Sequence, residues 1–247
     1  MPGYELIGKE EFSEVKSVFD EGGILFRHSF DHLRNGVYKV QEFEKSFAKR
    51  MNVQHALAVT SGTAALRVAL AALDIKTGDE IITQSFTFVA TAEAIIESRA
   101  IPVITEIDKT LNMDPVDLEN KITNNTKAIM PVHYTGDVGD LNSFYAFATN
   151  YKLRVIEDAA HAYGSTYQGR KVGTLGHVTC FSFDPIKNIT CGEGGAVVTD
   201  DDELAKRVVV KRILGIDKDT WNRYQKERSW FYEVVTPGYR YHMSNIN

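Results

Sequence analysis

Around Lys187 the sequence reads Phe181-Ser182-Phe183-Asp184-Pro185-Ile186-Lys187-Asn188-Ile189-Thr190-Cys191-Gly192-Glu193-Gly194-Gly195, a short irregular stretch between two apolar runs. An amine on a rigid turn can form a Schiff base with a carbonyl cofactor, which is the chemistry of pyridoxal phosphate (PLP). Ser182 could add a hydroxyl group to a phosphate site, and the two final glycines allow a tight return into the next strand. Alone, the stretch is also typical of a surface lysine in a turn.

A second motif is Val59-Thr60-Ser61-Gly62-Thr63-Ala64-Ala65-Leu66, in which an apolar strand passes through a Ser-Gly-Thr turn into an alanine-rich helix. Free N–H groups and the dipole at a helix start favour a phosphate, and small residues let it approach closely. The simpler interpretation is an ordinary N-cap, in which Ser61 or Thr63 satisfies the helix backbone. Taken by itself, the motif favours the N-cap.

A third motif is Val155-Ile156-Glu157-Asp158-Ala159-Ala160-His161-Ala162-Tyr163-Gly164, where an acidic residue leaves an apolar strand among small residues. In a PLP enzyme, a carboxylate paired with the pyridine nitrogen keeps that nitrogen protonated. The cationic ring in turn favours the ionised carboxylate. The alternatives are a helix cap at Asp158 and a packed, hydrogen-bonded core histidine at His161.

The three motifs occur in a chain whose short apolar runs alternate with helical patterns. This alternation predicts an α/β fold, a three-layer sandwich around a mostly parallel seven-stranded sheet. Apolar runs without polar alternation indicate strands covered on both faces. Such sheets bind ligands at the carboxyl ends of their strands, where all three motifs fall. The expected strands are Ala56–Thr60, Glu80–Thr83, Pro102–Glu106, Ala128–Val132, Arg154–Glu157, Thr179–Phe183 and Ala196–Thr199. The expected helices are Glu10–Asp20, Gln41–Met51, Thr63–Leu73, Thr87–Glu97, Pro115–Ile122, Leu141–Asn150 and Asp202–Leu214.

Composition narrows the classes of function. The 247 residues are 43% hydrophobic and 25% charged, enough for one large domain. The net charge of −5 gives no general attraction to nucleic acid or to an acidic membrane surface. No apolar run approaches the roughly 18 residues of a membrane span, and the N-terminus lacks the pattern of a signal peptide. We therefore expect a cytoplasmic protein. Cys180 and Cys191 form no CxxC pair, which favours buried free thiols over a disulfide or a metal site.

Together the three motifs resemble the DegT/DnrJ/EryC1/StrS family, PLP-dependent sugar aminotransferases of fold type I. The resemblance runs from about Glu42 onward and includes Pro131-Val132-His133 and Gly238-Tyr239-Arg240-Tyr241. It implies that Lys187 forms the Schiff base with PLP and later moves a proton between cofactor and substrate. It implies that Asp158 pairs with the pyridine nitrogen and that Phe88 stacks on the ring. By the same resemblance, the phosphate is held by Gly62, Thr63 and Ser182.

Two positions depart from the usual family pattern. His161 stands where many members have glutamine, near the 3-hydroxyl of the cofactor. Arg240 stands where the family has asparagine, in a region that reaches the phosphate of a partner subunit. The resemblance thus implies a homodimer that shares its active site. A branch of the family that dehydrates sugars has histidine at the position of Lys187, so the lysine argues against that branch.

The ends of the chain give a domain prediction. Residues 1–35 are expected to be an N-terminal segment and residues 36–247 a PLP-binding large domain. The sequence stops at Pro237-Gly238-Tyr239-Arg240-Tyr241-His242-Met243-Ser244-Asn245-Ile246-Asn247 without a terminal helix pattern or a stop signal, so a C-terminally truncated chain is expected, lacking the family's small C-terminal domain. Gly22–Val40 is either a substrate-facing loop or a surface connection with scattered charge. Asp217–Glu233 has no clean period.

The function indicated is transfer of an amino group, from glutamate, to a keto sugar, nucleotide-linked, for surface polysaccharide. Phe26-Arg27-His28-Ser29-Phe30-Asp31 resembles a subset that aminates higher-carbon keto sugars of the Kdo type, whereas Lys187-Asn188-Ile189-Thr190-Cys191 resembles enzymes that aminate UDP-linked 4-keto pentoses. Two alternatives stay open at this point. One is a PLP-binding regulator or inactive paralogue. The other is a nucleotide-binding dehydrogenase, although no G-x-G-x-x-G follows the first strand.

Overall fold

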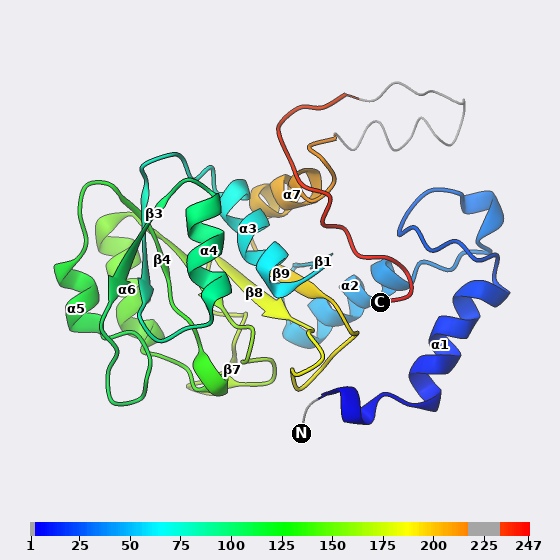
Figure 1. The fold of residues 1–247 in the computed structure, drawn as a ribbon, viewed down its shortest axis with the longest axis horizontal. Coiled ribbons are helices and arrows are strands. Elements are labelled where there is room, and N and C mark those ends of the chain that lie inside the picture. Colours follow the sequence, from blue (N-terminus) through cyan, green and yellow to red (C-terminus); the bar gives the residue numbers. More distant parts are fainter. Residues whose placement is uncertain (1–2, 217–232) are drawn as a thin grey trace.

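A seven-stranded sheet lies at the centre of the computed structural model, which describes residues 3–216 and 233–247 (Figure 1). The order across the sheet is β1-β9-β8-β5-β4-β2-β3, and every expected strand is present. The strands are β1 (His55–Val59), β2 (Glu80–Gln84), β3 (Ile101–Thr105), β4 (Thr126–Met130), β5 (Arg154–Asp158), β8 (Val178–Ser182) and β9 (Gly195–Thr199).

The sheet is mostly parallel, as the sequence predicts. Only β9 runs antiparallel to its neighbours, and it does so on both sides, against β1 and β8. The other pairings are all parallel. Because β1 and β8 are both antiparallel to β9, they run parallel to each other, and β8 is parallel to β5. The last residues of β1, β5 and β8 therefore meet at one edge of the sheet, which we call the carboxyl edge.

The expected α-helices are all present, with some different ends. They are α1 (Lys9–Asp20), α2 (Lys39–Met51), α3 (Gly62–Ala72), α4 (Val89–Glu97), α5 (Pro115–Asn120), α6 (Leu141–Tyr151) and α7 (Asp202–Lys211). The prediction that a helix starts at Thr87 is wrong, because Phe88 is extended and serves as the N-cap of α4. The prediction of a last helix to Leu214 is wrong as well. Leu214 has a positive φ, and the Lys211 carbonyl accepts from Tyr239 N.

Short elements fill the connections. The sequence patterns did not indicate the hairpin of β6 (Thr166–Tyr167) and β7 (Arg170–Lys171), nor the 3-10 helices η1 (Gly3–Leu6), η2 (Asp31–Leu33) and η3 (Tyr134–Gly136). Cys180 and Cys191 are free thiols, as expected, but only Cys180 is buried, because Cys191 lies in the partly exposed loop between β8 and β9. None of the helices within residues 3–216 and 233–247 has the length and apolar character needed to cross a bilayer.

Helices cover both faces of the sheet, which confirms the three-layer sandwich. On one face α3, α4 and α7 pack in a single core with Leu57 and Val59 of β1. On the other face α2 covers Ala56 and Ala58 of the same strand, and α5 and α6 cover β2, β4 and β5. Successive residues of a strand thus enter different cores, as expected where both faces are buried.

Side chains take the place of a missing neighbour along β1, which ends the sheet on one side. Ala58 N donates to Glu44 Oε1 at 2.9 Å, and Ala58 O accepts from Arg212 Nη1 at 2.8 Å. Glu44 also pairs with Arg27 Nη2 at 2.7 Å and with Arg212 Nη1 at 2.6 Å. An edge strand with unpaired backbone groups invites other chains to pair with it. Here a partly buried carboxylate and a buried guanidinium close that edge.

The segment 22–40 buries two of its charged side chains, although much of it is exposed. Arg27 and Arg34 are 6% and 1% exposed. Arg34 Nη2 donates to the carbonyls of Phe26 and His28, at 2.8 and 2.9 Å. Asn245 Nδ2 donates to Phe26 O at 3.0 Å and binds the segment to the end of the chain. Residues 217–232, which make up nearly all of the other unassigned stretch, lie outside the described residues.

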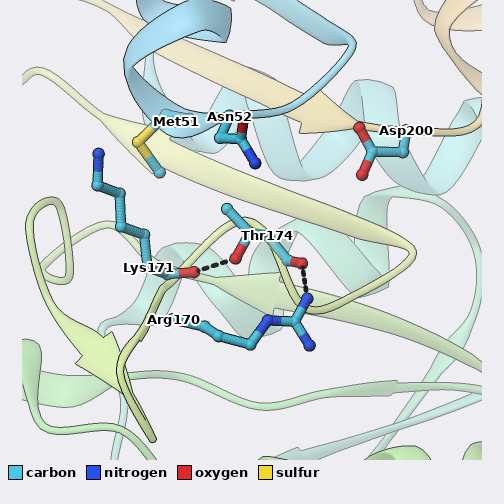
Figure 2. Close-up of a pocket in the computed structure, with 6 residues that line it drawn as sticks. All are labelled: Met51, Asn52, Arg170, Lys171, Thr174 and Asp200. Atoms are coloured by element: carbon cyan, nitrogen blue, oxygen red, sulfur yellow. Dashed lines mark hydrogen bonds between the residues drawn. The ribbon is translucent and has the colours of Figure 1, made fainter.

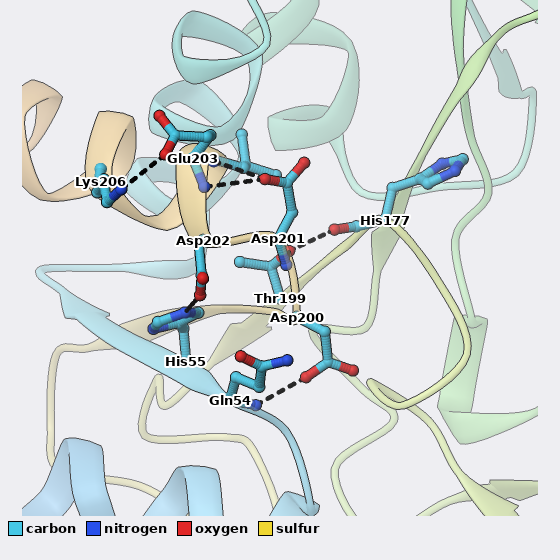
Figure 3. Close-up of polar contacts among 10 residues, drawn as sticks. Gln54, His55, His177, Thr199, Asp200, Asp201, Asp202, Glu203 and Lys206 are labelled. Atoms are coloured by element: carbon cyan, nitrogen blue, oxygen red, sulfur yellow. Dashed lines mark hydrogen bonds and ion pairs between the residues drawn. The ribbon is translucent and has the colours of Figure 1, made fainter.

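Polar contacts stabilise the edge of the sheet opposite the carboxyl edge, where β1 starts, β9 ends and α7 begins (Figure 3). Asp201 caps this helix by accepting from the N–H groups of Glu203 and Leu204, each at 3.0 Å. His55 Nε2 lies 2.6 Å from Asp202 Oδ1, and Thr199 Oγ1 donates to His177 O at 2.6 Å. This cluster holds the start of β1 and the end of β9 to α7.

Replacing Glu44 with alanine should leave Arg27 and Arg212 as buried cations without a carboxylate. Removing one partner of a buried ion pair costs about 3–5 kcal/mol, so the free energy of unfolding in urea should fall by about that amount. Glu93 is an exposed glutamate of α4, and Glu93→Ala should change stability by less than about 0.5 kcal/mol. Equal losses for the two variants would contradict a structural role for the Glu44 cluster.

Candidate active site

The carboxyl edge brings the Ser-Gly-Thr turn against Ser182. In the sheet Gly195 pairs with both Val59 and Ser182, so the ends of β1 and β8 flank the start of β9. A Cβ atom on Gly62 would lie 2.8 Å from Ser182 Cβ and 3.1 Å from its Oγ. Only a glycine permits this approach. The structure therefore places Gly62 beside Ser182.

Ser61 is the N-cap of α3, as the simpler interpretation of this motif predicts. Its Oγ accepts from Ala64 N at 3.0 Å. The first N–H groups of a helix have no acceptor within the helix, which leaves those of Gly62 and Thr63 directed outward at the positive end of the dipole. The cap and an anion site are therefore compatible, because they use different groups.

Asp158 ends β5 and is 6% exposed. Its carboxylate accepts from Thr91 Oγ1 at 2.8 Å and from Ala160 N at 3.2 Å. Burial raises its pKa, and these two hydrogen bonds, with the charges of His133 and His161, act in the opposite direction. In the described part of the chain no basic side chain forms an ion pair with this carboxylate. The helix-cap interpretation is wrong, since no α-helix begins between Asp158 and β6.

Against the effect of burial, the negative charge of Asp158 raises the pKa values of Lys187 and His161. Burial lowers the pKa of Lys187, opposed by the carboxylates of Asp184 and Asp158. Burial and then the charge of Lys187 lower the pKa of His161. His161 Nδ1 accepts from Thr135 N at 3.2 Å. Because the neutral ring then carries its proton on Nε2, it presents a donor on the other side. Lys187 is half-buried, unlike a typical surface lysine.

Phe88 and Arg240 are the two predicted site residues with the most exposed side chains. Phe88 is 67% exposed at the start of α4. It is adjacent to Thr87, whose Oγ1 lies 2.8 Å from Thr91 Oγ1, so this helix end is linked to Asp158. Arg240 is exposed and forms a β-bridge with Ile213. No contact in the described residues joins either side chain to Lys187.

A buried polar network behind Asp158 was missed in the sequence. Glu157 is fully buried, and its carboxylate lies 2.9 Å from His133 Nε2 and accepts from Tyr145 OH at 2.5 Å. Burial, and then the Glu157 charge, raises the pKa of Tyr145. His133 N also donates to Asp158 O at 3.0 Å. Strand alternation could have separated the roles of the two acidic residues, because neighbours in a strand point to opposite faces.

A pocket of about 350 Å³ lies elsewhere, where α2 and β9 end (Figure 2). Its lining residues are Met51, Asn52, Arg170, Lys171, Thr174 and Asp200. Arg170 Nη2 donates to Thr174 O at 2.5 Å, and Thr174 Oγ1 donates to Lys171 O at 2.8 Å. These polar groups bind one another, and no predicted site residue lines the pocket.

The residues at the carboxyl edge fit a cofactor with an anionic group and a cationic ring. Helix N–H groups and the Ser182 hydroxyl suit a phosphate. The buried carboxylate of Asp158 suits a protonated ring nitrogen, which would supply the cation it lacks. Lys187 lies in the loop that follows β8 at the same edge, and the Asp158 charge acts on its amine. No group of histidine, cysteine, aspartate or glutamate side chains within the described ranges is arranged to hold a metal ion.

Comparison with known proteins identifies the class to which the fold and site belong. The chain belongs to the DegT/DnrJ/EryC1/StrS aminotransferase family, whose model matches residues 26–247. It is 47% identical over 242 residues to the spore coat polysaccharide biosynthesis protein SpsC of Bacillus subtilis (strain 168), covering 98% of this chain and 60% of SpsC. The chain thus spans about three-fifths of the length of this relative.

Solved structures show the same fold. Helicobacter pylori PseC, an aminotransferase involved in the biosynthesis of pseudaminic acid, is 32% identical with a TM-score of 0.84 over 97% of this chain and 60% of PseC. NtdA of Bacillus subtilis, solved with bound cofactor PMP, is 30% identical with a TM-score of 0.83 over 99% of this chain and 52% of NtdA. The fold is that of PLP-dependent aminotransferases of fold type I, as the sequence indicated.

The Lys187 amine should lose its proton at a lower pH than exposed lysines do, because burial disfavours its charged form. Competitive acetylation across a pH series, read by mass spectrometry, measures the midpoint for each lysine. In Asp158→Asn the midpoint of Lys187 should fall further, since this carboxylate raises the pKa of Lys187. Asp74→Asn, at an exposed residue of the far end of α3, is the control. A midpoint equal to that of exposed lysines would contradict the assignment.

Proposed function

We propose that this chain is the cofactor-binding part of a PLP-dependent aminotransferase that moves an amino group, from glutamate, to a keto sugar. The sugar is proposed to be nucleotide-linked and destined for a surface polysaccharide. SpsC, named for spore coat polysaccharide biosynthesis, and PseC support this class of substrate. The observation that carries the proposal is the buried Asp158 carboxylate, which has no cationic partner in the described chain. It ends β5 at the same sheet edge from which β1 leads into α3 and β8 leads into the Lys187 loop.

The residues have distinct tasks in this proposal. Bound PLP supplies an aldehyde for the amine and an electron-withdrawing ring. The N–H groups of Gly62 and Thr63, with the Ser182 hydroxyl, bind the phosphate. Asp158 faces the ring nitrogen, and Phe88 covers the ring from the start of α4.

Lys187 is the proposed acid and base. Burial lowers its pKa, so a larger fraction of the amine is neutral near pH 7 than for an exposed lysine. A neutral amine can accept a proton from the substrate carbon that bears the nitrogen and pass it to the cofactor, or carry a proton in the reverse direction. The Asp158 and Asp184 carboxylates favour the ammonium form that results. One side chain can thus serve both directions of proton transfer.

His161 is proposed to donate its Nε2–H to the 3-oxygen of the cofactor. The hydrogen bond from Thr135 N to Nδ1 fixes this tautomer. A glutamine amide at the same position would offer an N–H donor of similar reach. Arg240 is proposed to bind the phosphate in a partner subunit, for which its exposure leaves it available, so the site is shared in a cytoplasmic homodimer.

On mixing with PLP, the chain should bind the cofactor and, after borohydride reduction, carry it on the Lys187 peptide. Lys187→Ala should abolish this attachment, whereas Lys109→Ala, at an exposed lysine, should leave it unchanged. Absorbance and peptide mapping provide the measurement. Attachment spread evenly over surface lysines in the parent would refute the cofactor site.

Amino transfer is tested separately with glutamate and a panel of keto sugars, both nucleotide-linked sugars and higher-carbon sugars of the Kdo type. Lys187→Ala should give no turnover. Saturable PLP attachment at Lys187 without transfer to any sugar of the panel would instead indicate a PLP-binding regulator. Full turnover by Lys187→Ala would contradict the proposed proton transfer by Lys187.

Exchanging His161 for glutamine should keep PLP affinity within a few-fold, because the amide keeps a donor. His161→Leu removes that donor, and a lost hydrogen bond of about 1.4 kcal/mol corresponds to roughly tenfold weaker binding. Titration of PLP absorbance measures both. If the two variants bind PLP equally well, His161 does not donate to the cofactor.

A further inference from the structure

The N-terminal segment touches the backbone of Lys187, although it lies outside the part of the chain that the family model matches. Gly3, the first residue of η1, donates its N–H to Lys187 O at 2.6 Å. In Figure 1 the dark blue start of the described chain lies beside the loop that joins β8 to β9. Nothing in the proposed chemistry accounts for this contact.

The contact is close enough to require glycine. A Cβ atom on Gly3 would lie 2.8 Å from Lys187 O, 3.0 Å from Thr190 Cγ2 and 3.2 Å from Thr190 N. Two of these three atoms are backbone, so the loop or the segment must move to admit a methyl group. Gly8, five residues later, offers a contrast, because a Cβ atom there would meet only Leu6 O, at 3.9 Å.

The Lys187 loop is also held from its other side. Asn188 Nδ2 donates to Tyr163 O at 2.8 Å, two residues beyond His161. Thr190 Oγ1 donates to Phe183 O at 2.8 Å and returns the loop to the end of β8. Gly3 supplies the hydrogen bond to the carbonyl of the lysine itself. The backbone on both sides of the reactive amine is therefore fixed by residues outside the loop.

The segment is anchored at its far end too. Glu14 of α1 pairs with Lys39 Nζ at 2.6 Å, at the start of α2, and Asn35 Nδ2 donates to Glu21 Oε2 at 3.1 Å. Between these anchors α1 lies apart from the three layers of the sandwich (Figure 1). A groove of about 170 Å³ separates the segment from the loop, lined by Gly3, Leu6, Ile7, Glu11, Asn188, Ile189 and Thr190.

We propose that η1 (Gly3–Leu6) is a positioning element of the active site, which fixes the Lys187 backbone through the Gly3 N–H group and closes one side of the lysine loop. The proposal rests on the proposed function, in which Lys187 moves protons. Proton transfer needs donor and acceptor within hydrogen-bond reach, and a displacement of about 1 Å can cost a large part of the rate. The segment therefore controls how well Lys187 performs its step without touching the substrate.

The test compares Gly3→Ala with Gly8→Ala, using a readout that needs neither cofactor nor turnover. The pH midpoint for acetylation of Lys187 should rise in Gly3→Ala toward the ordinary lysine value of about 10.4, because burial is the chief cause that lowers it. Amide hydrogen exchange in residues 186–192 should become faster. Gly8→Ala, at the N-cap of α1, should match the parent in both measurements.

A second variant lacking residues 2–7 keeps the test decisive, since it removes the contact without inserting an atom. It should reproduce the shift in midpoint and the faster exchange. If both Gly3→Ala and the truncated chain retain the parent midpoint and exchange, the proposal is wrong. Where amino transfer is measurable, Gly3→Ala should lower kcat with little change in KM for the keto sugar. Failure of PLP to attach at Lys187 would count against the proposed function alone, because acetylation does not depend on it.

Discussion

The buried charge of Asp158 is the constraint on which the candidate site depends. A carboxylate removed from water must be compensated or become protonated. Thr91 and Ala160 supply two hydrogen bonds, which only partly offset burial, since its pKa stays raised. A cationic ring nitrogen would complete the compensation. In a cofactor-loaded protein the ring and Asp158 would therefore stabilise each other. The hydrogen bonds from Thr91 and Ala160 hold the carboxylate in place for that pair.

The arrangement of the sheet could be predicted from the sequence because its strands are covered on both faces. Such strands appear as uninterrupted apolar runs, and their parallel direction brings the three motifs to one edge. Other features leave no such pattern. The strands β6 and β7 are two residues each, too short for any period. Thr91 lies within an apolar helix, and only the tertiary fold brings its hydroxyl to Asp158. Phe88 is the opposite case. Family resemblance assigned it to the site, and its contact with the cofactor ring stays a prediction.

Buried arginines are the part of the fold furthest from sequence expectation. Arginine is seldom buried unless it is paired, and the pairing here joins residues far apart in the chain. Glu44 and Arg212 are separated by 168 positions, and Glu44 and Arg27 by 17. Burial lowers the pKa of Arg27 to about 10, opposed by Glu44. The irregular segment after α1 looked like a loop because the carboxylate that pairs with Arg27 lies in α2.

The contacts that close the β1 edge of the sheet also position the proposed phosphate site. Glu44 and Arg212 hold Ala58, whose neighbour Val59 pairs with Gly195. A Cβ atom on Gly195 would lie 2.4 Å from Ser61 O, so only a glycine fits where β9 begins against the turn. Shifting β1 by one residue would reverse which side chains face each core and would carry Ser61 and Gly62 away from Ser182. The ion pairs at the edge thereby set the position of α3, where the proposed phosphate binds, although they touch no ligand.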